Sequence, residues 1–159
     1  MTCLASIYRD RRGAALLEMT VVTPFLILLG LGVFEFSNLL YGQHLITTGV
    51  RDAARYLARR DDPLGSANAG IEIAVMGEVS GTAKRVSWWN LADVSVTLIP
   101  TANPINVATG TRPYRGPDPL NVVRVSTTVT YPGLGMLSAI GISSSLTLTL
   151  SHEERVVGE

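Results

Sequence analysis

The sequence has little charge and almost no cysteine. Asp, Glu, Lys and Arg make up 16% of its 159 residues, well below the roughly 25% of an ordinary soluble domain. The single cysteine, Cys3, excludes an intramolecular disulfide framework and a multi-cysteine zinc site. Apolar residues reach 47%, and the mean hydropathy is +0.29. These values disfavour both a disordered chain and a strongly basic nucleic-acid binder, so we expect no nucleic-acid partner.

The sequence also lacks the common catalytic motifs. It contains no P-loop, GxGxxG, GxSxG or HExxH pattern, and its two histidines, His44 and His152, have no metal-ligand spacing. Only Ser151-His152-Glu153 sets a hydroxyl beside a base, and adjacent residues on a strand point to opposite faces. We therefore expect no enzyme, no catalytic residue, no bound metal and no cofactor.

The formal net charge is zero, but the charges are unevenly distributed along the chain. No Lys or Arg lies between Arg12 and Arg51. Residues 1–60 carry seven arginines against four carboxylates, whereas residues 61–159 carry six basic side chains against nine acidic ones. A globular surface scatters its charges, so this sorting indicates a chain that meets a membrane.

Residues 14–41 are long and apolar enough to cross a bilayer. Their only ionisable carboxylates are Glu18 and Glu35. Arg9, Arg11 and Arg12 stand immediately upstream, and the positive-inside tendency puts that end in the cytoplasm. This predicts a single-pass membrane protein whose residues after Tyr41 lie outside the cytoplasm. No A-x-A-like site closes the apolar run, which disfavours a cleaved secretory signal and leaves an uncleaved signal anchor open.

The helical pattern continues past the apolar run to residue 60. A helix over 14–60 is about 70 Å long, far beyond a hydrocarbon core of about 30 Å, so its second half must stand outside the membrane on a support. Pro24 is the expected place for a kink. Arg51, Arg55 and Arg59 fall on one face of this helix, and Asp52 beside them is expected to be a solvated or locally paired charge.

Beyond the helix, the pattern changes from helical to strand periodicity. A turn-rich hinge over 61–70 and a short helix over 71–76 precede alternating segments at Asp93–Ile99, Asn121–Tyr131 and Ser145–Ser151. They predict a small antiparallel sheet that covers the outer half of the long helix. The proline-rich segment between the first two strands is expected to be an exposed, flexible loop, and Trp88-Trp89 to pack on the core.

The fold class expected is therefore α+β, in three parts. Residues 1–13 form a cytoplasmic leader and residues 14–60 a transmembrane and extended helix. Residues 61–159 form a periplasmic α+β domain, whose sheet supports that helix.

A carboxylate just inside the apolar run needs an explanation, because an ionised acid at mid-membrane costs about 2.5–3.5 kcal/mol on insertion scales. Glu18 could reach the cytoplasmic headgroups. However, the run Arg11-Arg12-Gly13-Ala14-Ala15-Leu16-Leu17-Glu18 resembles the processing site of type IV pilin-like precursors, particularly the short-leader class of Flp pilins. The resemblance implies that a prepilin peptidase cuts between Gly13 and Ala14. The Glu18 carboxylate of one subunit would then neutralise the new Ala14 amine of a neighbour.

The run GAALLEMTVVTPFLILLGLGVFEF, followed by a helix rich in Ala-Ala-Arg, is similar to the TadE-like family of pseudopilins from tight-adherence (Flp pilus) systems. The resemblance covers residues 11–60 and 121–159. It implies assembly through the helix rather than chemistry, with the prepilin peptidase, other pilins and pseudopilins, the inner-membrane secretion platform and the lipid bilayer as partners. The alternative is an uncleaved, signal-anchored periplasmic scaffold or binding module. Glu35, near the outer end of the apolar run, is expected to be an interfacial acid that reaches water.

Overall fold

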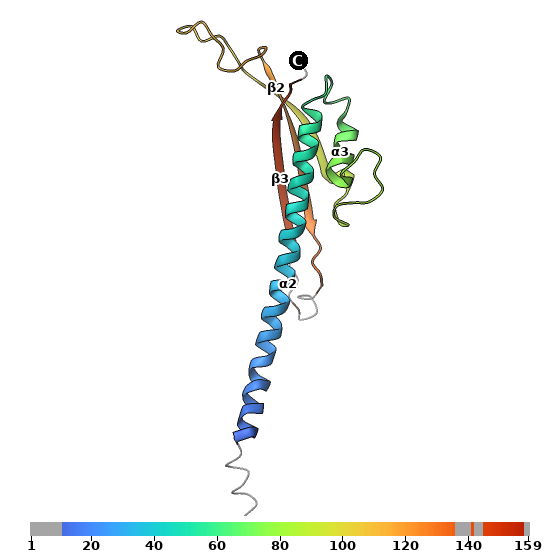
Figure 1. The fold of residues 1–159 in the computed structure, drawn as a ribbon, viewed down its shortest axis with the longest axis vertical. Coiled ribbons are helices and arrows are strands. Elements are labelled where there is room, and N and C mark those ends of the chain that lie inside the picture. Colours follow the sequence, from blue (N-terminus) through green and yellow to red (C-terminus); the bar gives the residue numbers. More distant parts are fainter. Residues whose placement is uncertain (1–10, 136–140, 142–144, 158–159) are drawn as a thin grey trace, which may run out of the picture. The chain divides into compact units, whose positions relative to one another are not determined.

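The structure, a computed structural model, describes residues 11–135, 141 and 145–157. Its elements follow the order α2, α3, η1, β1, β2 and β3, in the α+β layout expected from the sequence (Figure 1). The chain divides into two compact units, Met1–Asn38 with Gly133–Ser143 and Leu39–Pro132 with Ser144–Glu159.

The long helix is continuous. Helix α2 spans Arg11–Leu57, 47 residues, and includes Pro24. It ends three residues before the predicted limit, where the chain tightens into a turn closed by the Arg60 N–H donating to the Leu57 carbonyl at 3.0 Å. The stretch Ala15–Leu57 is long and apolar enough to cross a membrane. Within it, the hydroxyls of Thr20 and Thr23 donate to backbone carbonyls one turn earlier, at 2.7 and 2.6 Å. These bonds give the two hydroxyl groups hydrogen-bond partners within the helix, which an apolar environment could not supply.

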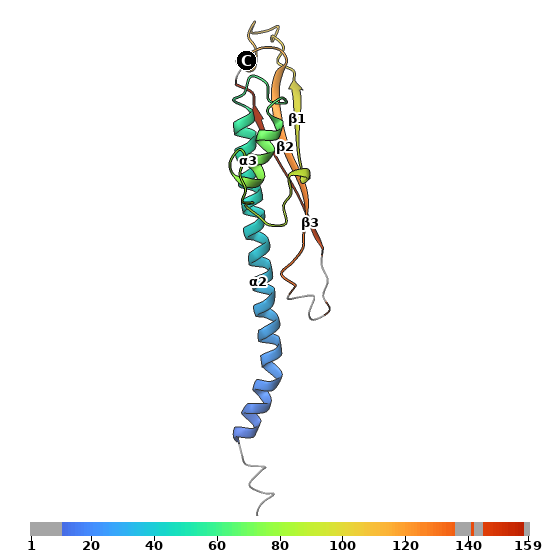
Figure 2. The ribbon, with the colours of Figure 1, turned by 90° about the vertical axis from the view of Figure 1, so that its right-hand side faces the viewer.

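The second unit contains a three-stranded antiparallel sheet in the order β1-β2-β3 (Figure 2). Its strands are β1, Val94–Thr101, β2, Leu120–Tyr131, and β3, Leu146–Arg155. The three strands predicted from alternation are confirmed. The third runs four residues beyond its predicted end, because pairing continues through Val122↔Arg155.

One face of the sheet packs against residues 39–57 of α2, as predicted. The buried positions of this helix recur every three or four residues, which places them on one face. They meet inward-pointing valines of β2 and a fully buried tryptophan in a single apolar core made of Ile46, Val50, Ala53, Ala54, Leu57, Trp89, Val123 and Val125, among others.

A second helix also packs on this core, through Ala74 and Val75. Helix α3 spans Ala67–Met76 and is followed by Gly77 in the left-handed conformation, whose N–H donates to the Ile73 carbonyl at 2.9 Å. The helix begins inside the segment predicted as a hinge and is longer than the predicted 71–76. It runs against α2 at Gly49, where an added Cβ would lie 2.3 Å from the Ala74 carbonyl oxygen. Glycine is required there because the two backbones nearly touch.

The tryptophan pair divides between core and surface. Trp89 is 0% exposed, and its Nε1 donates to the Thr127 hydroxyl at 3.0 Å. That hydroxyl donates in turn to the Asp93 carbonyl at 2.8 Å, beside the short 3-10 helix η1, Leu91–Asp93. Trp88 is half-buried and meets the Tyr131 ring edge-on at 5.5 Å between centroids. The prediction of a core role for the pair is thus confirmed for Trp89.

The segment between β1 and β2 is ordered at its base by Asn103. This side chain is 0% exposed, and its amide nitrogen donates to the carbonyls of Tyr114 and Pro117 at 2.9 and 3.1 Å. Its amide oxygen accepts the Tyr114 N–H at 3.0 Å. The tip of the loop is exposed, as predicted, with Val107 100% exposed.

Candidate assembly helix and its polar side chains

The residues of the predicted processing site lie at the start of α2. Gly13 is exposed, and nothing stands within 4 Å of the position that a Cβ would take there. Ala14 follows in the same helix, while Arg9 lies outside the described residues. Arg11 and Arg12 form the first helical positions. The residues on either side of the bond expected to be cut therefore lie within α2.

Glu18 lies one helical turn after Ala14, and its side chain is exposed. Both predicted assembly residues therefore lie in the opening turns of α2. The helix around them presents large apolar side chains. Leu16, Leu17 and Met19 are 70%, 69% and 60% exposed, which is the surface that a lipid or a neighbouring helix would cover.

The prediction that the Glu35 carboxylate reaches water is wrong. Glu35 is only 9% exposed, and its Oε1 accepts the backbone N–H of Leu134 at 2.8 Å. Leu134 follows Gly133, whose φ of +75° is left-handed. The chain just after β2 therefore returns to α2 and supplies the carboxylate with a donor. The alternation and helix patterns of the sequence carry no signal of this contact, because the two residues are 99 positions apart.

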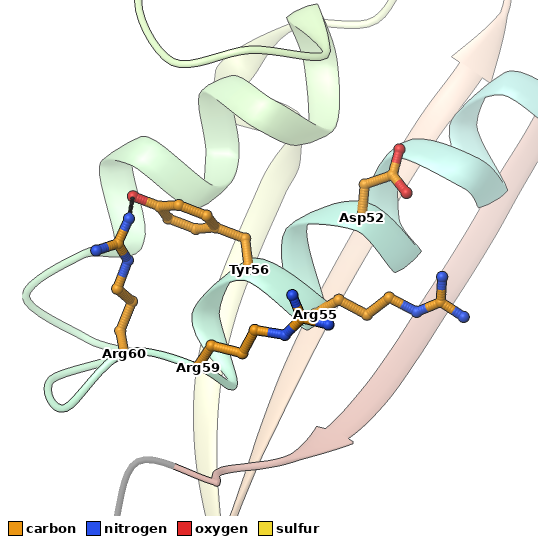
Figure 3. A pocket seen from close by; sticks show the side chains of 5 residues that line it. All are labelled: Asp52, Arg55, Tyr56, Arg59 and Arg60. Atoms are coloured by element: carbon orange, nitrogen blue, oxygen red, sulfur yellow. Dashed lines mark hydrogen bonds between the residues drawn. The ribbon is translucent and has the colours of Figure 1, made fainter.

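The arginine face of α2 also contains an ion pair. The Arg85 guanidinium lies 2.7 Å from the Asp52 carboxylate, so Asp52 is paired, but with a residue distant in sequence and not with a local one as predicted. Asp52 borders an open pocket of about 460 Å³ that is lined further by Arg55, Tyr56, Arg59 and Arg60 (Figure 3).

The arginines that line this pocket differ in their contacts. The Arg60 guanidinium stacks over the Tyr56 ring, 4.3 Å from its centroid, and donates to the phenolic oxygen at 2.7 Å. Arg55 and Arg59 take part in no ion pair among the residues that the structure describes. The end of α2 is thus a basic, water-facing surface that leaves two guanidinium groups available to an anion.

The hydroxyl and base of the C-terminal Ser-His-Glu sequence form no catalytic arrangement. His152 Nε2 lies 3.3 Å from the Glu154 carboxylate, two residues along β3 and therefore on the same face, whereas Ser151 alternates to the other face. Among residues 11–135, 141 and 145–157, no group of three His, Cys, Asp or Glu is placed to hold a metal ion.

A comparison with known protein families finds a similarity that is confined to α2. The family model described as TadE-like protein matches residues 13–55, which is almost the whole of α2 and excludes the sheet. No curated protein and no solved structure matches the chain. The TadE-like family is a family of pilus structural components and is not known as a family of enzymes. The resemblance expected from the sequence is therefore confirmed over this helix: residues 13–55 are similar to a TadE-like protein, and they form an apolar helix long enough to serve as a membrane anchor.

Proposed function

We propose that this chain is a pseudopilin of a Flp (tight adherence) pilus system that is anchored in the bacterial inner membrane and matured by a prepilin peptidase between Gly13 and Ala14. The observation that carries the proposal is the TadE-like match over residues 13–55. It coincides with a helix whose most apolar 18-residue window is 0% buried in the fold. A helix that offers so much apolar surface needs lipid or other helices around it.

Cleavage of the leader would create a positive charge at the new N-terminus, and we propose that this charge takes part in subunit assembly. Removal of residues 1–13 leaves an ammonium group on Ala14 in an apolar setting, where burial of either charge alone is costly. The exposed Glu18 carboxylate of a neighbouring subunit is the proposed partner of that amine. Other pilins, pseudopilins and the inner-membrane secretion platform are the proposed partners of the helix, with the leader in the cytoplasm and residues 61–159 in the periplasm.

The cleavage step is tested by the intact mass of the chain purified from hosts with and without a prepilin peptidase. We expect a mature chain that begins at Ala14 only when the peptidase is present, and full-length chain for Gly13→Val, because a bulky side chain obstructs the scissile bond. Gly30→Val, at a helical glycine outside the motif that also has nothing within 4 Å of a Cβ position, is the matched control and should be cut normally. A chain that begins at Met1 in both hosts contradicts this proposal and favours the uncleaved anchor.

The pairing step is tested separately by substitutions at Glu18. Glu18→Gln should be cut at the same site but should lose most cross-linking to neighbouring subunits, because it cannot neutralise the Ala14 amine. Glu18→Asp keeps the charge and should retain part of the cross-linking. Wild-type assembly of the Glu18→Gln chain would refute the pairing.

A further inference from the structure

Glu35 and the chain after β2 form a contact within one compact unit of the molecule. Both Glu35 and Gly133–Gly135 belong to the unit that contains the first part of α2. The contact combines a buried carboxylate, a backbone N–H donated at 2.8 Å and a left-handed glycine. An added Cβ on Gly133 would lie 3.0 Å from Glu35 Oε1, so glycine allows the backbone to approach the carboxylate.

The height of this contact along α2 follows from helix geometry. About 20 residues, at 1.5 Å each, cross a hydrocarbon core of about 30 Å. A span that begins near Ala15 therefore reaches the outer edge of the core near Glu35. The side chains beside Glu35 agree with this position, since Val33, Phe34 and Phe36 are 58%, 66% and 59% exposed.

Non-helical backbone at this depth is tolerated only where its polar groups have partners. A carboxylate at this depth is also costly on its own. The bond from the Leu134 N–H to Glu35 relieves both costs at once. Leu134 itself is 46% exposed, and the sequence from Val125 to Ser151 contains no Asp, Glu, Lys or Arg.

We propose that Glu35 fastens the start of the β2–β3 connection to the membrane helix, so that Leu134 inserts into the outer leaflet as a second lipid contact of the chain. This inference rests on the membrane anchoring in the proposed function. The occupant of the exposed Leu134 surface is lipid, because Leu134 is bonded to Glu35, whose neighbours Val33, Phe34 and Phe36 are exposed apolar residues of the anchor helix.

The test measures lipid contact at Leu134 in the full chain. Leu134→Cys is made in a Cys3→Ser background, labelled with an environment-sensitive fluorophore and reconstituted in phosphatidylcholine–phosphatidylglycerol vesicles that contain doxyl-labelled lipid. Leu26→Cys, in the apolar half of α2, is the lipid control, and Val107→Cys, 100% exposed, is the water control. We expect strong quenching by doxyl lipid at positions 26 and 134 and none at 107.

Glu35 is then changed in the Leu134→Cys chain. Glu35→Gln should keep the quenching, because an amide oxygen still accepts the Leu134 N–H. Glu35→Ala should lose most of the quenching, because it removes the acceptor of the Leu134 N–H. Gly133→Ala should also lose most of the quenching, because its added Cβ would lie 3.0 Å from Glu35 Oε1. Continued quenching at position 26 in each variant shows that the anchor is intact.

Each other outcome has a defined meaning. Quenching absent at position 26 contradicts the anchoring itself and therefore the proposed function. Quenching present at 26 but absent at 134 overturns only this inference, and cross-linking of position 134 between two chains would then identify a second copy as the occupant. Equal quenching at 134 in the Glu35→Ala and unchanged chains overturns the role of Glu35.

Discussion

The two halves of α2 are both apolar, but they use different side chains in different surroundings. From Leu16 to Phe36 the helix carries large residues that face outward, with Phe25 and Leu29 69% and 67% exposed. From Ile46 to Leu57 the apolar face is buried and alternates large side chains with small ones, and Ala53 and Ala54 are 0% exposed. Bulky side chains suit a fluid solvent of lipid tails, whereas small ones allow a helix and a sheet to approach closely.

Glycine shows the same difference. Gly30 and Gly32 have nothing within 4 Å of a Cβ position, whereas Gly42 and Gly49 lie against Trp88 and against Ala74 and Trp89. One continuous helix therefore contains a portion whose side chains pack in the core of the domain and a portion whose side chains are largely exposed. Substitutions matched between the halves can break or sharpen this conclusion.

The largest effect is expected for Trp89→Ala, because the indole is fully buried and also loses its bond to Thr127. We expect a loss of about 3–5 kcal/mol in the free energy of unfolding. It is measured by denaturant unfolding of the detergent-solubilised full chain, with the fluorescence of the remaining Trp88 as the signal. Phe25→Ala, in the exposed half, should leave the unfolding midpoint unchanged. Equal midpoints for the two variants would contradict the division.

An intermediate effect is expected for Gly49→Ala. The added methyl would meet the Ala74 carbonyl oxygen at 2.3 Å, so α3 must shift, at a cost of about 1–3 kcal/mol. The measurement is the same unfolding experiment. Gly30→Ala is the matched control, since its methyl enters open space and alanine is the better helix former by roughly 1 kcal/mol. Destabilisation by Gly30→Ala of the same size as by Gly49→Ala would show that the first half of α2 is also tightly packed.

The smallest effect is expected for Asp52→Asn, which breaks the ion pair with Arg85. The carboxylate side chain is 38% exposed, and exposed pairs contribute only about 0–1 kcal/mol. The loss should shrink as salt is added, because salt screens exposed charges. Asp61→Asn, an exposed control, should change nothing at any salt concentration. A loss for Asp52→Asn as large as that for Gly49→Ala would mean that the pair anchors the segment around Arg85.

Much of the fold was predictable because it depends on local periodicity. The apolar run and the arginines before it indicated the long helix, and strict alternation indicated each strand within a few residues of its observed bounds. The buried Trp89 also followed from the sequence, since a large apolar ring on a small domain has few other places to go. The prediction of a hinge over 61–70 was partly wrong, because α3 begins at Ala67. Its first turn packs against α2, where Gly70 lies beside Leu57.

The sequence by itself determined the membrane-sized helix, the sheet that supports it and the TadE-like segment, because these depend on side-chain hydrophobicity at fixed short spacings. Only the tertiary structure decided which distant groups meet. It brought Leu134 to Glu35, Arg85 to Asp52 and Ala74 to Gly49, and it buried Asn103 at the base of its loop. Such contacts depend on how the chain returns in space, and no local spacing encodes that return.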